Sequence, residues 1–261
     1  MLIFFLVSLC ASIVGAVCGI GGGVIIKPVL DLFHLETVST ISFLSGCTVL
    51  SMSCYSVGRT LLAGEKRVAL STGTPLAIGA AVGGLLGSGL FSGVRAMFAD
   101  PNTVGSVQAA CLAVVTIGTL LYTVNKARIR THRVDSKAAC AAIGLALGCM
   151  SSFLGIGGGP INLVVLYFFF GMDTKTAAAN SLFIILFSQL TNLAATLVSG
   201  SVPPFRPMAL VLMVAGGVGG GIIGRALNKR MDDKAVEKLF IVLMAVIIGI
   251  SVYNCVRYAA G

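Results

Sequence analysis

Charged residues are scarce in this sequence. Asp, Glu, Lys and Arg make up 10% of its 261 residues, against about a quarter in an ordinary soluble domain. The chain also has no tryptophan and only two histidines. This composition excludes a soluble globular fold, and so few carboxylates and imidazoles provide no convincing catalytic set. We therefore expect a protein that is not an enzyme and that has no metal or other cofactor.

Two kinds of motif are also missing. The eight cysteines include no Cys-x-x-Cys pair and no Cys/His cluster with the spacing of a zinc site. The sequence has no Walker-type phosphate loop, so a pump driven directly by nucleotide would require a separate subunit.

Apolar residues are abundant, at 57% of the chain, and the mean hydropathy is +1.01. They fall into eight segments, four in each half, and this pattern predicts an all-α polytopic membrane protein within a lipid bilayer. The segments run roughly from 2 to 35, 37 to 58, 68 to 92, 104 to 124, 138 to 171, 176 to 199, 206 to 228 and 237 to 256.

The charged residues that do occur are mainly basic, with 18 Lys and Arg against 9 Asp and Glu. On a soluble chain, a formal charge of +9 would suggest binding to nucleic acid. Here the basic residues lie in short loops between apolar segments, so we expect them to determine membrane topology instead, with no nucleic-acid partner.

One pentapeptide occurs twice. Gly-Ile-Gly-Gly-Gly spans 19–23 and again 155–159, inside segments one and five, and the same shift of 136 residues superposes Ser45 on Ser181. The two halves therefore resemble a tandem duplication. We expect a first membrane repeat at 1–125, a basic cytoplasmic linker at 126–137 and a second membrane repeat at 138–261.

The loop charges choose between two topologies, because Lys and Arg collect in short cytoplasmic loops. If all eight segments cross, the two sides hold 10 and 8 basic residues. If segments one and five instead enter, break at the glycines and return, the split becomes 14 to 4. Each half then has three crossings and one re-entrant hairpin, which makes the halves inverted repeats. We adopt this topology, with both termini extracytoplasmic in a bacterial cytoplasmic membrane.

The lengths of the broken segments favour hairpins. A helix over 1–18 would be about 27 Å long, whereas the returning limb at 24–35 would reach only about 18 Å, against a hydrocarbon core of about 30 Å. The corresponding limb at 160–171 has the same length. Neither returning limb is long enough to cross.

The glycine breaks predict an anion site. They leave backbone N–H groups free inside the membrane, and the helix that follows begins with a partial positive charge. The alternative is that these glycines only permit close packing between helices. Two sets of three are predicted to bind the substrate: Gly21, Gly22 and Gly23, and Gly157, Gly158 and Gly159. Glycines spaced four apart in segments three and seven are instead predicted packing faces: Gly79, Gly83 and Gly87, and Gly216, Gly220 and Gly224.

Polar side chains inside apolar segments complete the predicted site, because an unpaired polar group in hydrocarbon is costly. Lys27 follows the first break by four residues and would attract an anion, unless it snorkels to the surface. Further candidates lie in the second segment of each half: Ser45 in the first half, and Asn180, Ser181 and Gln189 in the second. They could contact the substrate or form hydrogen bonds between helices.

At these residues the chain resembles the TauE/SafE sulfite exporter family of membrane permeases. The resemblance rests on the sequence from Gly19 to Leu30, on Leu-Gly-Ile-Gly-Gly-Gly-Pro-Ile at 154–161 and on the stretch 171–182, and it covers essentially the whole chain. It implies export, and sometimes uptake, of small sulfur-containing anions such as sulfite and organosulfonates. The chain departs from the family pattern at Lys27, where an apolar residue is usual, and at Val164, where a proline is common.

Together these features predict a secondary transporter, more specifically an exporter, of a small sulfur-containing oxyanion. The anion would bind between the two glycine-broken helix ends and move by alternating access. The alternatives are a passive anion channel and a transporter of a carboxylate anion. Proton coupling through Asp31, His34 or Glu36 and assembly into a homo-oligomer are both compatible with the sequence.

Overall fold

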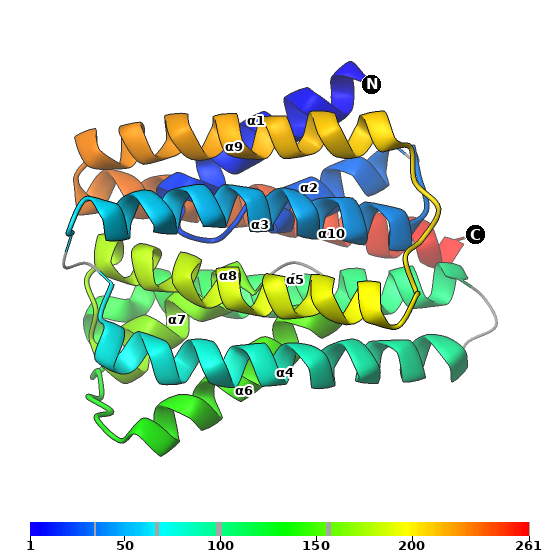
Figure 1. Ribbon diagram of the computed structural model, residues 1–261. Helices are drawn as coiled ribbons and strands as arrows, with labels where there is room; N and C mark the ends of the chain where they lie inside the picture. The colour runs from blue at the N-terminus through cyan, green and yellow to red at the C-terminus, as the bar shows by residue number, and fades with distance from the viewer. Residues whose placement is uncertain (34, 66–67, 98–100, 155–157, 261) are drawn as a thin grey trace.

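The computed structural model describes residues 1–260 except 34, 66–67, 98–100 and 155–157 (Figure 1). Within this part of the chain every regular element is helical, as the sequence predicts. The elements are α1 (Leu2–Cys18), α2 (Gly23–Leu32), α3 (Val38–Leu62), α4 (Leu70–Met97), α5 (Pro101–Asn125), the short 3-10 helix η1 (Lys126–Arg128), α6 (Lys137–Leu154), α7 (Gly159–Phe170), α8 (Thr174–Val198), α9 (Pro207–Arg230) and α10 (Asp233–Ala260).

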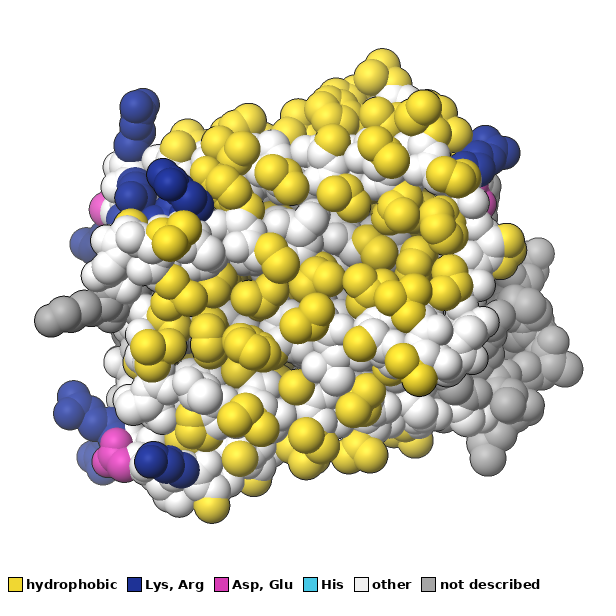
Figure 2. Space-filling model, viewed as in Figure 1, with side chains coloured by type: hydrophobic (Ala, Val, Ile, Leu, Met, Phe, Trp, Pro, Cys, Tyr) yellow, Lys and Arg dark blue, Asp and Glu magenta, His cyan; other side chains and the backbone are white. Residues whose placement is uncertain are grey.

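Seven of the described helices are long and apolar enough to cross a membrane: α3, α4, α5, α6, α8, α9 and α10. We call the end of the bundle where α1 starts and α10 stops the terminus end, and the opposite end, where α4, α6, α8 and α10 start, the basic end (Figure 1). Figure 2 shows hydrophobic side chains along the length of the bundle and Lys and Arg gathered mainly at the basic end. An apolar surface of this extent fits acyl chains, and the chain is an integral membrane protein.

The pair α1 and α2 forms a hairpin that starts and finishes at the terminus end (Figure 1). Phe4, near the start of α1, belongs to the same core cluster as Ala209, near the start of α9. At the end of α2, Leu32 O accepts a hydrogen bond from Arg257 of α10 at 3.2 Å. The first broken segment therefore returns to the side from which it enters.

The pair α6 and α7 forms a second hairpin, at the basic end. α6 starts directly after the linker, and the end of α7 is bound to that same linker. The N–H groups of His132 and Val134 donate to Phe168 O at 2.7 Å and to Phe169 O at 3.0 Å. The two hairpins thus enter the bundle from opposite ends, while an inverted relation between the complete halves stays a prediction.

Each hairpin packs its longer helix against a glycine face of the other half, α1 along α9 and α6 along α4. A Cβ added at Gly220 would lie 2.5 Å from Ser12 Cβ, and one added at Gly83 would lie 2.9 Å from Cys149 N. Real Cβ atoms essentially never approach so closely, so the backbones themselves are in contact. The predicted packing faces are confirmed, and their exchange between halves holds the repeats together.

Alanine at Gly83 is expected to destabilise the protein by about 1–3 kcal/mol, because its methyl group would force α4 and α6 apart. The matched control is Gly118→Ala on α5, where an added Cβ would meet nothing within 4 Å. Thermal unfolding in detergent, followed by circular dichroism, measures both variants. Equal melting temperatures for the two would contradict the assigned packing face.

Candidate functional site

The first glycine run forms a tight turn at 19–22, which we call the first tip. Gly19 caps the end of α1 with a φ of 77°, a left-handed conformation that favours glycine. The tip is wedged between α3 and α8, since a Cβ at Gly21 would lie 3.2 Å from Val49 and 3.4 Å from Ile185. The break is therefore enclosed by protein, where irregular backbone is tolerated at membrane depth.

Backbone donors are left over at the first tip. The carbonyl of Gly22 accepts from the N–H groups of Ile25 and Ile26 in the first turn of α2. The N–H groups of Gly21, Gly22 and Gly23 belong to buried residues, and none of them donates to a described residue. Buried N–H groups at a helix start require an acceptor and carry partial positive charge. That these three groups bind an anion stays a prediction.

Three buried hydroxyl groups, on the hairpin and on the two helices that pack against it, are further candidates. Ser12 Oγ would lie 3.1 Å from a Cβ at Gly22. The predicted site residues Ser45 and Ser181 lie on α3 and α8, each one helical turn from a side chain that contacts the first tip. None of the three oxygens has a hydrogen-bond partner among the described residues. Because a hydroxyl can donate as well as accept, each is available to an anion.

The second glycine run, 155–159, which we call the second tip, is described only at its end. The prediction for Gly157 falls outside the described residues. Gly158 precedes α7 with a φ of 77°, and Pro160 occupies the first turn of α7, where proline is favoured. A Cβ at Gly158 would lie 2.6 Å from Ser151 Oγ, another buried hydroxyl without a described partner.

The two tips touch. A Cβ added at Gly159 would overlap the carbonyl oxygen of Ile20 and lie 2.5 Å from Ile20 Cα. Only a residue without a side chain permits so close an approach of two backbones. The opposed hairpins therefore bring the described end of the second glycine run against the first tip inside the bundle.

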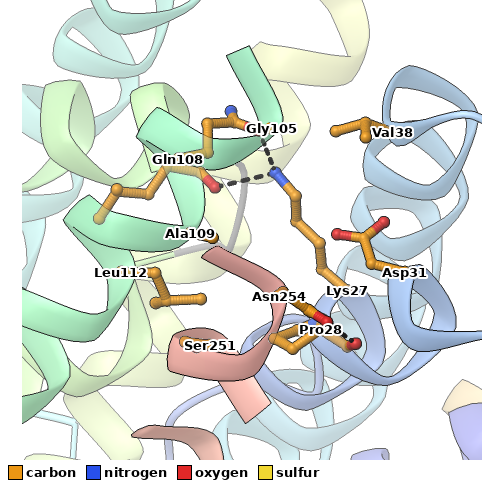
Figure 3. Close-up of a pocket in the computed structure, with 11 residues that line it drawn as sticks. Lys27, Pro28, Asp31, Val38, Gly105, Gln108, Ala109, Leu112, Ser251 and Asn254 are labelled. Atoms are coloured by element: carbon orange, nitrogen blue, oxygen red, sulfur yellow. Dashed lines mark hydrogen bonds between the residues drawn. The ribbon is translucent and has the colours of Figure 1, made fainter. Parts of the chain in front are cut away.

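Lys27 points into the protein, so the snorkelling alternative is wrong. Its side chain is 4% exposed, and its ammonium donates to Gln108 Oε1 at 2.8 Å and to Leu154 O at 3.2 Å (Figure 3). Leu154 is the last residue of α6, immediately before the second tip. Lys27 therefore connects the first hairpin to the second and places a cation beside the second tip.

Gln108 of α5 is a site residue that the sequence analysis missed. Its Nε2 donates to Phe153 O at 3.1 Å, which turns its Oε1 towards Lys27. Gln108 could have been found from the sequence, because it is an amide side chain inside the apolar segment 104–124, where an uncompensated polar group is costly.

A cavity of about 450 Å³ leads from the terminus end into the bundle. The predicted residue Gln189 lines it and makes no hydrogen bond to a described residue, although its side chain is only 7% exposed. At its inner end the cavity reaches Gln108. Much of its lining is hydroxyl and amide groups, including Ser39, Ser42, Ser88, Asn192, Thr196 and Ser199. The cavity offers a small anion a polar path towards the hairpins.

Asn180 makes an interhelical contact. Its Nδ2 donates to Thr176 O at 2.8 Å, and its Oδ1 accepts from Ala69 N at 3.1 Å. The first bond lies within α8, and the second joins α8 to the residue just before α4 at the basic end. Of the two roles open to Asn180, the structure shows the interhelical one, and contact with the substrate stays a prediction.

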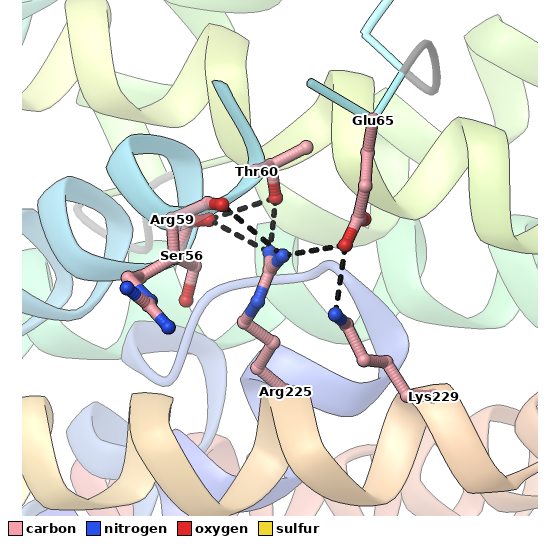
Figure 4. A network of polar contacts seen from close by, with 6 residues as sticks. All are labelled: Ser56, Arg59, Thr60, Glu65, Arg225 and Lys229. Atoms are coloured by element: carbon pink, nitrogen blue, oxygen red, sulfur yellow. Dashed lines mark hydrogen bonds and ion pairs between the residues drawn. The ribbon is translucent and has the colours of Figure 1, made fainter. Parts of the chain in front are cut away.

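A polar network closes the basic end between α3 and α9 (Figure 4). The guanidinium of Arg225 donates to Ser56 O at 3.2 Å, to Thr60 Oγ1 and to Glu65 Oε1 at 2.8 Å. Lys229 binds the same carboxylate oxygen at 2.8 Å. The cavity of about 450 Å³ therefore lies towards the terminus end, while the basic end holds this network and a cavity of only about 40 Å³.

Comparison with known proteins agrees with this architecture. The family model described as sulfite exporter TauE/SafE matches residues 4–251. The chain is also 27% identical to YunE, a probable membrane transporter protein of Bacillus subtilis, over 94% of each chain. No solved structure matches it at a significant level. Because the family match extends over nearly the whole chain and includes both hairpins, the protein belongs to the TauE/SafE sulfite exporter family of membrane transporters.

Proposed function

We propose that this protein is a secondary transporter, working as an exporter, of a small sulfur-containing oxyanion such as sulfite or an organosulfonate. The observation that carries the proposal is the contact between the two tips, in a bundle whose first tip has buried N–H groups without an acceptor among the described residues. The N–H groups of Gly21, Gly22 and Gly23 and the hydroxyls of Ser12, Ser45 and Ser181 are buried without a described acceptor. Such a set matches the oxygens of a compact anion.

Charge supports the same ligand. The positive end of α2 faces the site, and the ammonium of Lys27 lies beside the second tip with only neutral oxygens as hydrogen-bond partners. Asp31, one helical turn away on α2, lines the same small cavity and compensates this charge in part, and a bound anion would be attracted to the ammonium as well. The choice of a sulfur oxyanion over a carboxylate rests on the family to which the chain belongs.

The difference between the two ends supports transport by alternating access. The polar cavity is open towards the terminus end, and the Arg225 network ties the basic end. Rearrangement of the hairpins against the surrounding helices would close the cavity and release the network. The 14 to 4 distribution of basic residues supports a cytoplasmic basic end and extracytoplasmic termini.

A ligand screen tests this proposal. The melting temperature of the purified protein is expected to rise by about 2–4 °C with sulfite, thiosulfate or a small sulfonate, because a ligand that binds only the folded state stabilises that state. Acetate and other small carboxylates are expected to leave it unchanged. The stabilising anion should then show saturable flux and counterflow in proteoliposomes. Stabilisation by carboxylates alone would favour a carboxylate transporter, and flux that never saturates would indicate a channel.

A further inference from the structure

The Lys27 ammonium is held as a metal cation would be. Both of its hydrogen-bond partners, Gln108 Oε1 at 2.8 Å and Leu154 O at 3.2 Å, are neutral amide oxygens. Oxygens of this kind are the ligands that hard cations accept in proteins. Gln108 is itself fixed by its bond to Phe153 O, so both oxygens near the ammonium are set in place from α5 and α6.

The position of the Leu154 carbonyl in the fold also fits a cation site. Leu154 ends α6, so its carbonyl lies at the partially negative end of a broken helix. In secondary transporters, unwound carbonyls and the C-terminal ends of broken helices coordinate the co-transported cation. The ammonium of Lys27 reaches this location from α2, on the other hairpin.

A small cavity of about 20 Å³ beside the ammonium also contains a carboxylate. Asp31 lines it one helical turn after Lys27, together with Gln108 and Leu154 (Figure 3). Its Oδ1 atom is buried and has no hydrogen-bond partner among the described residues. The cavity therefore combines two placed amide oxygens with nearby negative charge, which is the composition of a site for a monovalent cation.

We propose that Lys27 is a built-in cation that takes the place of a bound alkali-metal ion at the end of α6. Its part in transport rests on the proposed function, because the fixed ammonium would supply positive charge beside the second tip without a bound sodium or potassium ion. The cation site itself rests only on the oxygens around the ammonium. Truncating Lys27 leaves these oxygens in place and opens the site to a free cation.

The test compares Lys27→Ala with the wild type during thermal unfolding in detergent, in sodium chloride, methylammonium chloride and choline chloride. We expect sodium or methylammonium to raise the melting temperature of Lys27→Ala by about 2–4 °C relative to choline, which is too large for the site. The wild type should melt at the same temperature in all three salts. Lys234→Ala, which removes an exposed lysine at the basic end, is the matched control and should behave as the wild type.

A second substitution shows where the cation binds. Adding Gln108→Leu to Lys27→Ala removes one of the two oxygens and is expected to abolish the shift. A Lys27→Ala protein that melts identically in all three salts overturns the proposal, as does a wild type that sodium stabilises equally. If the alanine variant does not fold, Lys27→Ser leaves similar space, and failure of both to fold in any of these salts also overturns it.

The measurement uses no oxyanion, so its outcome is separate from that of the proposed function. A cation-dependent shift in Lys27→Ala without transport of any sulfur anion would retain the cation site and refute the function. If the wild type shows saturable sulfite flux but the melting temperature of Lys27→Ala is the same in all three salts, the function is retained and the built-in cation is refuted.

Discussion

Replacement of Gly22 by valine is expected to lower oxyanion transport at least about 100-fold in a protein that still folds and reaches the membrane. Gly22 has a φ of −68°, so valine meets no left-handed strain. Its Cβ would lie 3.1 Å from Ser12 Oγ and 3.2 Å from Ser12 N, so the added side chain would press against α1 and displace the first tip with its N–H groups. Loss of two hydrogen bonds to a charged ligand, at about 1.5–3 kcal/mol each, accounts for this reduction.

Initial flux into proteoliposomes, normalised to folded protein, measures the effect. Gly22→Ala adds one tight contact and should show an intermediate loss, whereas Gly118→Val adds the same side chain on an exposed face of α5 and should leave flux unchanged. Wild-type flux in Gly22→Val would remove the first tip from the binding site.

The second large effect is expected from Arg225→Ala. This change removes the bonds to Ser56 O, Thr60 and Glu65 that join α9 to α3 and to the chain beyond it, and the side chain is only 15% exposed. We expect the closed arrangement of the basic end to lose about 2–3 kcal/mol relative to the alternative arrangement, which corresponds to a population shift of about 30- to 150-fold. Transport should fall by at least about 10-fold.

The neighbouring Lys229→Ala is the control for this prediction. Its ammonium binds the same Glu65 oxygen, but its side chain is 53% exposed. An exposed ion pair contributes at most about 1 kcal/mol, so flux should stay near the wild-type value. Equal flux in the two variants, measured by the same proteoliposome assay, would show that the Arg225 network does not control the basic end.

The hairpins could be predicted from the sequence because two general physical limits apply to them. The limb that became α2 is too short to cross hydrocarbon, and cytoplasmic loops retain Lys and Arg whatever the details of packing. Local chemistry also accounts for an element boundary. Asp173 precedes α8 and its carboxylate accepts from Thr176 N at 2.9 Å, as expected of a helix N-terminal residue.

The assembly of the site could not be predicted in the same way, because it depends on contacts distant in sequence. The contact of Gly159 with Ile20 requires both hairpins to reach the same depth, which periodicity does not encode. Lys27 donates to Gln108, which lies 81 positions further along the chain on a helix that contains no recognised motif. Segment composition identified polar residues such as Gln189 and Asn180, but only the fold separates the one that lines the cavity from the one that joins two helices.

The central claim, that the two tips together bind the substrate, is tested most directly by an experimental structure determined with the oxyanion that gives the largest shift in the ligand screen. The predicted result is density for the anion within hydrogen-bond distance of the N–H groups of Gly21, Gly22 and Gly23, next to Gly158. Density confined to the outer part of the cavity, with these N–H groups bonded to protein alone, would contradict the account.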